Sequence, residues 1–235
     1  MKYTTILFDL DGTLLPMDLA VFKKKYFTEL VKSIAQRGYD AELLMKGIMN
    51  GIEEMLSNDG NRTNEKAFFD AMQAVLGDRI YDDIKYFRDF YDNEFDNIKH
   101  FVGKNPKAFD VINILKARGY RLILATNPVF PMIATVKRIC WAGLSPLDFE
   151  LITTYEDFHF SKPSKGYYNE ILDRFDLRAK ECLMVGNDTS DDLSAMNAGI
   201  DVFLVTDNLI NETGVDISKY PNGGLEDLLD YLSLN

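Results

Sequence analysis

Five short runs of β-branched and apolar residues alternate with helical patterns, and this alternation constrains the fold of the chain more than any other feature. None of the runs alternates cleanly with polar residues, which is typical of strands buried on both faces of a parallel sheet. Strand and helix in turn predict an α/β fold with a doubly wound parallel sheet. The expected strands cover residues 5–8, 121–125, 149–153, 182–185 and 202–205, and helical patterns lie between the later ones at 106–118, 132–141 and 167–175.

The alternation of strand and helix patterns stops after the first expected strand and resumes about 80 residues later. This interval contains four apolar patterns at helical spacing, which predict a bundle of amphipathic helices. We therefore expect a core domain from residues 1–16 and 99–235, and a helical insertion from residues 17–98. The four patterns cover 19–36, 42–56, 65–76 and 80–95, and the aromatic residues at 81, 86, 87, 90, 91 and 95 are expected in the core of the bundle.

Charge and composition exclude several classes of partner. The chain has 26 Lys and Arg against 37 Asp and Glu, a net charge of −11, which disfavours binding to a nucleic-acid backbone. No apolar stretch approaches the ~20 residues of a membrane-spanning helix. Cys140 and Cys182 show neither a metal-binding nor a disulfide spacing, so both are expected as small core residues in a reducing compartment. These features predict a cytoplasmic protein without a membrane or nucleic-acid partner, and they leave its oligomeric state open.

Two carboxylates follow the first expected strand. Asp9 and Asp11 are two positions apart, so on a strand their side chains point to the same side. They lie at the carboxyl end of that strand, where open α/β sheets place their sites. Neighbouring carboxylates repel unless a cation or a proton intervenes, and oxygen ligands of this kind suit Mg²⁺. Gly12 permits a tight exit from the strand.

Four strings in order resemble the haloacid dehalogenase-like hydrolase superfamily. They are Phe-Asp-Leu-Asp-Gly-Thr-Leu at 8–14, Leu-Ile-Leu-Ala-Thr-Asn at 122–127, Ser-Lys-Pro at 161–163 and Met-Val-Gly-Asn-Asp-Thr-Ser-Asp-Asp at 184–192. The resemblance implies a Rossmann-like core, a Mg²⁺ cofactor and an α-helical cap of the C1 type. The helical insertion lies where this family places such a cap.

The resemblance also implies roles for individual residues. Asp9 would be the nucleophile that forms an aspartyl-phosphate, and Asp11 would protonate the leaving oxygen and later deprotonate water. Thr126 and the backbone near Asn127 would bind the phosphoryl group, and Lys162 would neutralise its charge and restrain Asp9. Mg²⁺ would bind Asp9 and Asp11 together with an oxygen from the fourth string.

The fourth string departs from the commonest family pattern, in which Asp directly follows Gly. Here Asn187 follows Gly186, and Asp188 comes one position later. A hard cation favours an anionic oxygen, so Asp188 is the expected ligand, with Asn187 as the alternative. Asp192 is expected to support the loop or to be a further candidate ligand, and Asp191 is expected at the start of a helix.

The leading functional hypothesis is hydrolysis of a small phosphorylated metabolite. A sugar-phosphate mutase would share both carboxylates, and a non-catalytic binding protein could keep the fold, so both alternatives stay open. Dehalogenation is disfavoured, because that branch lacks an acid like Asp11.

Family resemblance implies that the cap selects the substrate. Lys23, Lys24 and Lys25 are expected mainly on a solvated helix face, although they lie near the mouth of the site. Arg62 lies in a loop that could reach over the cleft. His100 and His159 show no partner pattern and are expected to be structural or exposed.

Overall fold

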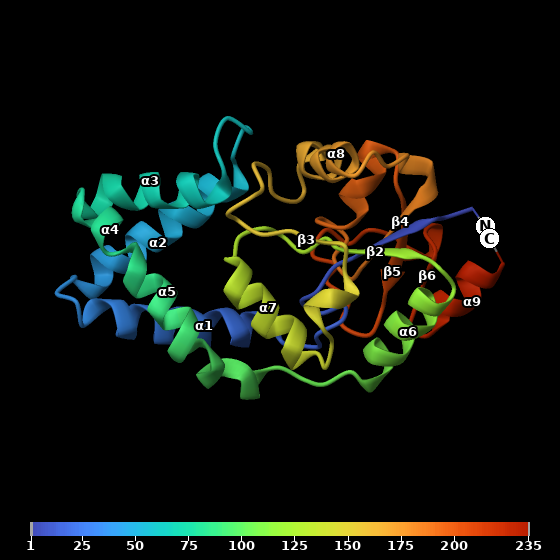
Figure 1. Cartoon of the computed structure of the whole chain (residues 1–235), viewed down its shortest axis with the longest axis horizontal. Coiled ribbons are helices and arrows are strands. Elements are labelled where there is room, and N and C mark those ends of the chain that lie inside the picture. Colours follow the sequence, from blue (N-terminus) through green and yellow to red (C-terminus); the bar gives the residue numbers. More distant parts are fainter. Residues whose placement is uncertain (1, 235) are drawn as a thin grey trace.

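A six-stranded parallel sheet forms the centre of the computed structural model, which describes residues 2–234 (Figure 1). The strand order is β3-β2-β1-β4-β5-β6, so the chain proceeds from β1 in one direction and returns through β4 in the other. This is the predicted doubly wound, Rossmann-like arrangement. The strands are β1 (Thr5–Phe8), β2 (Arg121–Leu124), β3 (Leu151–Ile152), β4 (Cys182–Gly186), β5 (Asp201–Val205) and β6 (Asn222–Gly223).

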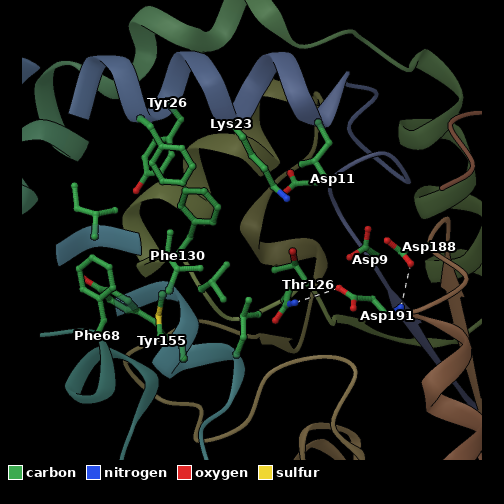
Figure 2. A pocket seen from close by; sticks show the side chains of 18 of the residues that line it. Asp9, Asp11, Lys23, Tyr26, Phe68, Thr126, Phe130, Tyr155, Asp188 and Asp191 are labelled. Carbon is green, nitrogen blue, oxygen red and sulfur yellow. Dashed lines mark hydrogen bonds between the residues drawn. The ribbon is translucent and has the colours of Figure 1, made fainter. Parts of the chain in front are cut away.

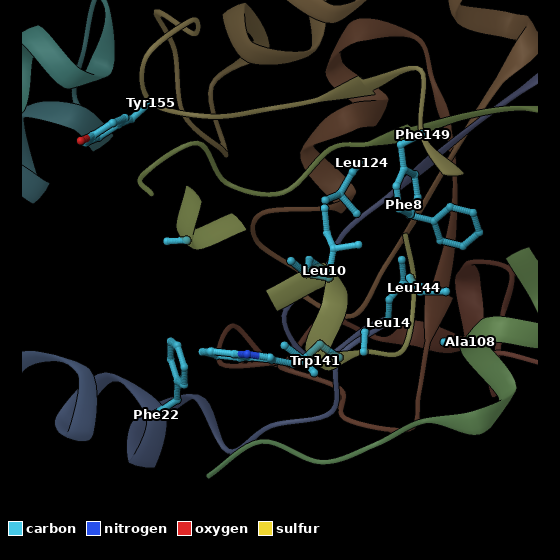
Figure 3. Close-up of a cluster of buried hydrophobic side chains, with 14 of the residues drawn as sticks. Phe8, Leu10, Leu14, Phe22, Ala108, Leu124, Trp141, Leu144, Phe149 and Tyr155 are labelled. Atoms are coloured by element: carbon cyan, nitrogen blue, oxygen red, sulfur yellow. The ribbon is translucent and has the colours of Figure 1, made fainter. Parts of the chain in front are cut away.

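Alternate residues of the central strands pack on opposite faces of the sheet. Phe8 and Leu124 belong to the larger apolar cluster, which Figure 3 shows reaching Trp141 on α7. Leu7 belongs to a second cluster together with Tyr167 of α8. Figure 1 accordingly shows α8 on one side of the sheet and the other core helices on the opposite side. The core helices are α6 (Pro106–Ala117), α7 (Met132–Trp141), α8 (Lys165–Arg174) and α9 (Asp227–Ser233).

The interval between β1 and α6 is helical, as predicted. Figure 1 shows its helices beside the sheet, beyond the carboxyl ends of the strands. The division into a core domain and an inserted cap stays a prediction. The helices are α1 (Leu19–Ala35), α2 (Ala41–Leu56), α3 (Asn64–Leu76), α4 (Arg79–Asp82) and α5 (Ile84–Asn93), followed by a 3₁₀ segment (Phe95–Phe101).

One expected helix is divided in two. The pattern at 80–95 forms α4 and α5, because the chain turns at Asp83, whose φ of −99° and ψ of 0° are not helical. The Asp83 carboxylate is held there by the Tyr39 hydroxyl at 2.9 Å and by Arg79 at 2.9 Å. Tyr81 is consequently exposed, while the other aromatic residues of the pattern are buried or half-buried.

The two cysteines differ in their burial. Cys140 is exposed on α7 and only Cys182 is buried, so the core assignment of Cys140 was wrong. No helix within residues 2–234 is long and apolar enough to span a membrane. The cytoplasmic location stays a prediction.

Candidate active site

The candidate site lies where β1, β2 and β4 end side by side. Phe8 is in register with Leu124 on one neighbour and with Val185 on the other. The residues that follow these strands therefore meet at one edge of the sheet. Asp9, Thr126 and Asn187 all line a cavity of about 390 Å³ at this edge. The three strings that close strands in the sequence are thus brought together.

Asp9 is buried and held from two sides. Its Oδ1 accepts a hydrogen bond from Lys162 Nζ at 3.0 Å, and its Oδ2 lies 3.2 Å from Thr13 Oγ1, whose single proton it shares with Asn187 Oδ1. Burial raises the pKa of Asp9 above its usual range, whereas the Lys162 ammonium opposes this shift. Lys162 therefore stabilises the ionised carboxylate that a nucleophile requires.

Lys162 is itself fixed by a second carboxylate, Asp192. The Lys162 ammonium is only 1% exposed and lies 2.7 Å from Asp192 Oδ1. Although burial alone would lower the pKa of Lys162, the carboxylates of Asp192 and Asp9 hold it well above its usual value. The other oxygen of Asp192 accepts a hydrogen bond from the backbone N–H of Asp188 at 2.9 Å. A Cβ at Gly186 would come within 2.1 Å of this carboxylate, so glycine is required there. The predicted loop-supporting role of Asp192 agrees with these contacts.

Both ends of the Asn187 amide are hydrogen-bonded to protein groups. Its Oδ1 accepts a hydrogen bond from Thr13 Oγ1 at 2.8 Å, and its Nδ2 donates one to the carbonyl of Asn208 at 2.7 Å. Gly12 has a φ of +91°, and a Cβ there would lie 2.3 Å from Asn187 Nδ2. Asn187 therefore connects the loop that follows β4 to the loop that follows β1.

One carboxylate oxygen of Asp188 is hydrogen-bonded to the backbone of its own loop. Its Oδ1 accepts hydrogen bonds from the N–H groups of Ser190 at 2.7 Å and Asp191 at 3.1 Å. Among residues 2–234, no side-chain or backbone donor reaches its Oδ2. Figure 2 shows Asp188 at the same end of the cavity as Asp9. Within those residues no cluster of three or more acidic, histidine or cysteine side chains is arranged to hold a metal ion.

Asp11 is paired with an arginine that the motifs did not reveal. The guanidinium of Arg138 on α7 binds Asp11 Oδ2, contacts Thr135 Oγ1 at 3.2 Å and lies 4.2 Å from the centre of the Phe130 ring. Arg138 is fully buried. Burial raises the pKa of Asp11, and the nearby guanidinium opposes that shift. A sequence signal existed, since Arg138 occupies a position on the otherwise buried face of the helix.

Asp191 was expected at the start of a helix, and it does lie just before one, but its side chain points into the cavity. The segment after it is a 3₁₀ helix that begins at Leu193, and the Asp191 carboxylate faces the cavity, where its Oδ2 accepts a hydrogen bond from Asn127 Nδ2 at 3.2 Å. Asn127 Oδ1 in turn accepts from the backbone N–H of Lys162 at 3.3 Å. Thr126 is 3% exposed and lines the cavity, as expected for a substrate contact.

Lys23, Lys24 and Lys25 are exposed, as expected. Lys23 also lines the cavity and lies beside Asp11 (Figure 2). Its charge lowers the pKa of Asp11, but the effects of burial, Arg138 and Lys162 on that pKa are larger. Arg62 instead forms ion pairs with Glu54 at 2.7 Å and Asp70 at 2.8 Å, and these hold it away from the cavity wall.

The remaining expectations concern aromatic and histidine side chains. Phe87 and Tyr91, expected only as bundle core, also line the cavity. His159 forms a hydrogen bond with Glu170 at 2.9 Å, which agrees with a structural role, and His100 packs against Phe101.

The charges at the site do not balance. Five carboxylates stand against three cations, which leaves an excess of two negative charges when all are ionised. Burial raises the pKa of Asp9, Asp11, Asp191 and Asp192, because desolvation disfavours the charged form of a carboxyl group. The carboxylates are those of Asp9, Asp11, Asp188, Asp191 and Asp192, and the cations are Lys23, Arg138 and Lys162.

A doubly wound parallel sheet with its candidate site at the carboxyl ends of the central strands is the arrangement of many α/β enzymes. The profile of the haloacid dehalogenase-like hydrolases matches residues 6–205, and the chain belongs to this family. A pyrophosphatase PpaX from Bacillus mycoides is 24% identical over 99% of this chain and 98% of its own length.

Solved structures show the same fold. A HAD phosphatase from Thermococcus onnurineus superposes with a TM-score of 0.59 at 18% identity, covering 97% of each chain. A magnesium-bound structure of the HAD hydrolase YfnB from Bacillus subtilis superposes with a TM-score of 0.56 at 23% identity, covering 99% of each chain.

Proposed function

We propose that the protein is a Mg²⁺-dependent phosphate monoester hydrolase acting on a small phosphorylated metabolite through an aspartyl-phosphate. The observation that carries this proposal is the pairing of two neighbouring carboxylates with different cations. Asp9 is bound by Lys162 at 3.0 Å, and Asp11 is bound by Arg138. One carboxylate can thereby serve as nucleophile while the other handles protons.

The reaction would proceed in two displacements on phosphorus. A carboxylate oxygen of Asp9 forms a bond to phosphorus as the bond to the leaving oxygen breaks, and Asp11 donates a proton to that oxygen. Asp11 then accepts a proton from water, whose oxygen attacks phosphorus and breaks its bond to Asp9. Lys162 and the Thr126 hydroxyl would stabilise the charge on the phosphoryl oxygens during both steps.

The residues at the site fit a divalent cation. Its donors are oxygen only, which suits Mg²⁺ with one or two carboxylates and several waters. The excess of two negative charges points the same way. We assign Asp9 and Asp188 as the principal side-chain ligands, because Asn187 is already hydrogen-bonded to Thr13 and Asn208 and Asp11 Oδ2 is bound by Arg138. Asp11, the third predicted ligand, would reach the cation only through its Oδ1, which has no hydrogen-bond partner within residues 2–234. When bound, the cation would supply positive charge that offsets phosphoryl–carboxylate repulsion.

Turnover of 4-nitrophenyl phosphate with Mg²⁺ and with EDTA tests the proposal. Wild type should be active with Mg²⁺ and inactive with EDTA, and Asp9→Asn should lose at least about 10³-fold in kcat. The matched control is Asp110→Asn, the same change at an exposed position of α6, which should keep wild-type turnover. Retention of more than a few per cent of activity in Asp9→Asn would overturn the nucleophile assignment.

A further inference from the structure

The cavity changes character away from the carboxylates. Figure 2 shows Asp9, Asp11 and Asp188 at one end and Tyr26, Phe68, Phe130 and Tyr155 at the other. These aromatic walls come from α1, from α3 and from the loops after β2 and β3. The two ends adjoin at Phe130, because its ring faces the cavity and also contacts the Arg138 guanidinium that binds Asp11. A substrate with its phosphate at Asp9 would therefore extend its leaving group along an apolar wall.

The helical insertion offers almost no polar partner to such a group. Among the described residues, Lys23 is the only charged side chain that the insertion contributes to the cavity, and it lies beside Asp11 at the phosphate end. The hydroxyls of Tyr26 and Tyr91 are hydrogen-bonded to each other at 2.6 Å. Burial raises the pKa of Tyr26 to about 12, so this phenol stays neutral. The remaining polar groups of this wall are tyrosine hydroxyls, so a charged group on the leaving group would lose its water without gaining a partner of opposite charge, which is costly.

Helix α2 adds a stripe of apolar residues to the same wall. Met49, Ile52 and Leu56 all line the cavity, and their spacing places them on one face of the helix. Met49 and Leu56 are 47% and 46% exposed, so both remain accessible to a ligand in the cavity. Leu43 on the same helix is equally exposed but does not line the cavity.

The size of the cavity sets the size of the leaving group. An apolar cavity of about 150 Å³ admits benzene, whereas this cavity has about 390 Å³. It has room for a bicyclic ring together with a phosphate. The aromatic walls offer flat faces against which a ring can pack.

We propose that the substrate is a phosphate monoester of an uncharged, largely apolar alcohol or phenol, whose leaving group packs between α1, α2, α3 and the Phe130 loop. This inference rests on the proposed phosphatase function and specifies its substrate class. It disfavours pyrophosphate and phosphoglycolate, because each carries a second charged group that would face the apolar wall.

The test compares four phosphate compounds with the Mg²⁺-loaded enzyme. Naphthyl phosphate carries the apolar group, phosphoglycolate and pyrophosphate carry a second charge, and acetyl phosphate is too small to reach the far wall. We expect kcat/KM for naphthyl phosphate to exceed that for phosphoglycolate and pyrophosphate by at least about a hundredfold. Equal or reversed values would overturn the inference while leaving the phosphatase function intact. Absence of Mg²⁺-dependent turnover of all four, acetyl phosphate included, would instead contradict the proposed function.

Variants of α2 test the wall itself. Met49→Gln/Leu56→Gln should lower kcat/KM for naphthyl phosphate about tenfold more than kcat/KM for acetyl phosphate, from lost apolar contact. The matched control Leu43→Gln, on the same helix outside the cavity, should alter neither. An unchanged naphthyl phosphate value in the double variant, or equal losses for both substrates, would contradict the proposal.

Discussion

Arg138 binds the carboxylate of Asp11 from a position 127 residues further along the chain. The pair is enclosed, since Arg138 is fully buried and the Asp11 side chain is 18% exposed. The guanidinium holds one oxygen of the Asp11 carboxylate, although Arg138 belongs to none of the four strings. A buried charge pair of this kind is costly to break, because removing one partner leaves the other charge without compensation.

Replacement of this arginine should therefore destabilise the fold. We expect Arg138→Met to lower the free energy of unfolding at neutral pH by about 3–5 kcal/mol, as measured by urea denaturation. Lys137→Met is the matched control on the same helix, because Lys137 pairs with the half-exposed Asp96 at its surface. That change should cost no more than about 1 kcal/mol. Equal losses in the two variants would argue against a special role for the buried pair.

The destabilisation by Arg138→Met should depend on pH. Burial already raises the pKa of Asp11, and loss of the opposing guanidinium would raise it further. A carboxyl with a raised pKa in the folded state stabilises below its unfolded pKa, and that contribution is lost as pH rises through the folded value. The difference in unfolding free energy between wild type and Arg138→Met should therefore be smaller in mildly acidic buffer and larger at neutral pH. A difference that grows on acidification would contradict this account.

Apolar patterning was sufficient to predict most of the fold. Five strands were found because each lies in a run of β-branched and apolar residues, whereas β6 was missed because Asn222–Gly223 is short, polar and at the sheet edge. The helical interval was also predicted, and its division at Asp83 was not, because a tertiary contact with Tyr39 holds that turn.

Only the site residues that lie within one of the four sequence strings could be predicted. Asp9, Thr126, Lys162 and the loop at 184–192 were identified in order and lie together in the structure. Arg138 has no string of its own, and its role depends on how α7 packs against the β1 loop. The cavity walls from four helices likewise follow from tertiary packing.

Metal affinity should distinguish Asp188 from Asn187. Asp188→Ala should raise the apparent Mg²⁺ constant in activity titrations by at least about 10-fold, because an anionic ligand is lost. Asn187→Ala should change that constant less, since its amide is bound to Thr13 and Asn208. The opposite ranking of the two variants would reassign the ligand.

A buried asparagine ties α3 to the sheet loops. Asn64 is fully buried, and its Nδ2 donates hydrogen bonds to the Pro128 carbonyl at 3.1 Å and to Ser161 Oγ at 3.2 Å. Its Oδ1 accepts one from Asn58 Nδ2 at 2.8 Å. Asn64→Ala should lower the free energy of unfolding by about 1–3 kcal/mol, because these partners are left unsatisfied.

Asn61→Ala is the matched control for this change, because Asn61 is exposed and its side chain bonds only to Asp59 within residues 2–234. It should shift the unfolding free energy by no more than about 0.5 kcal/mol. Similar effects of the two substitutions in urea denaturation would show that the buried contacts of Asn64 do not stabilise the fold.

Covalent phosphorylation of Asp9 is the central claim, and rapid-quench labelling measures it directly. The Mg²⁺-loaded enzyme is mixed with a radiolabelled aryl phosphate, quenched in acid at successive times and digested for peptide mapping. We predict transient label on the peptide containing Asp9 in wild type and none in Asp9→Asn. Wild-type turnover without label at any quench time, or label on the same peptide in Asp9→Asn, would contradict the account.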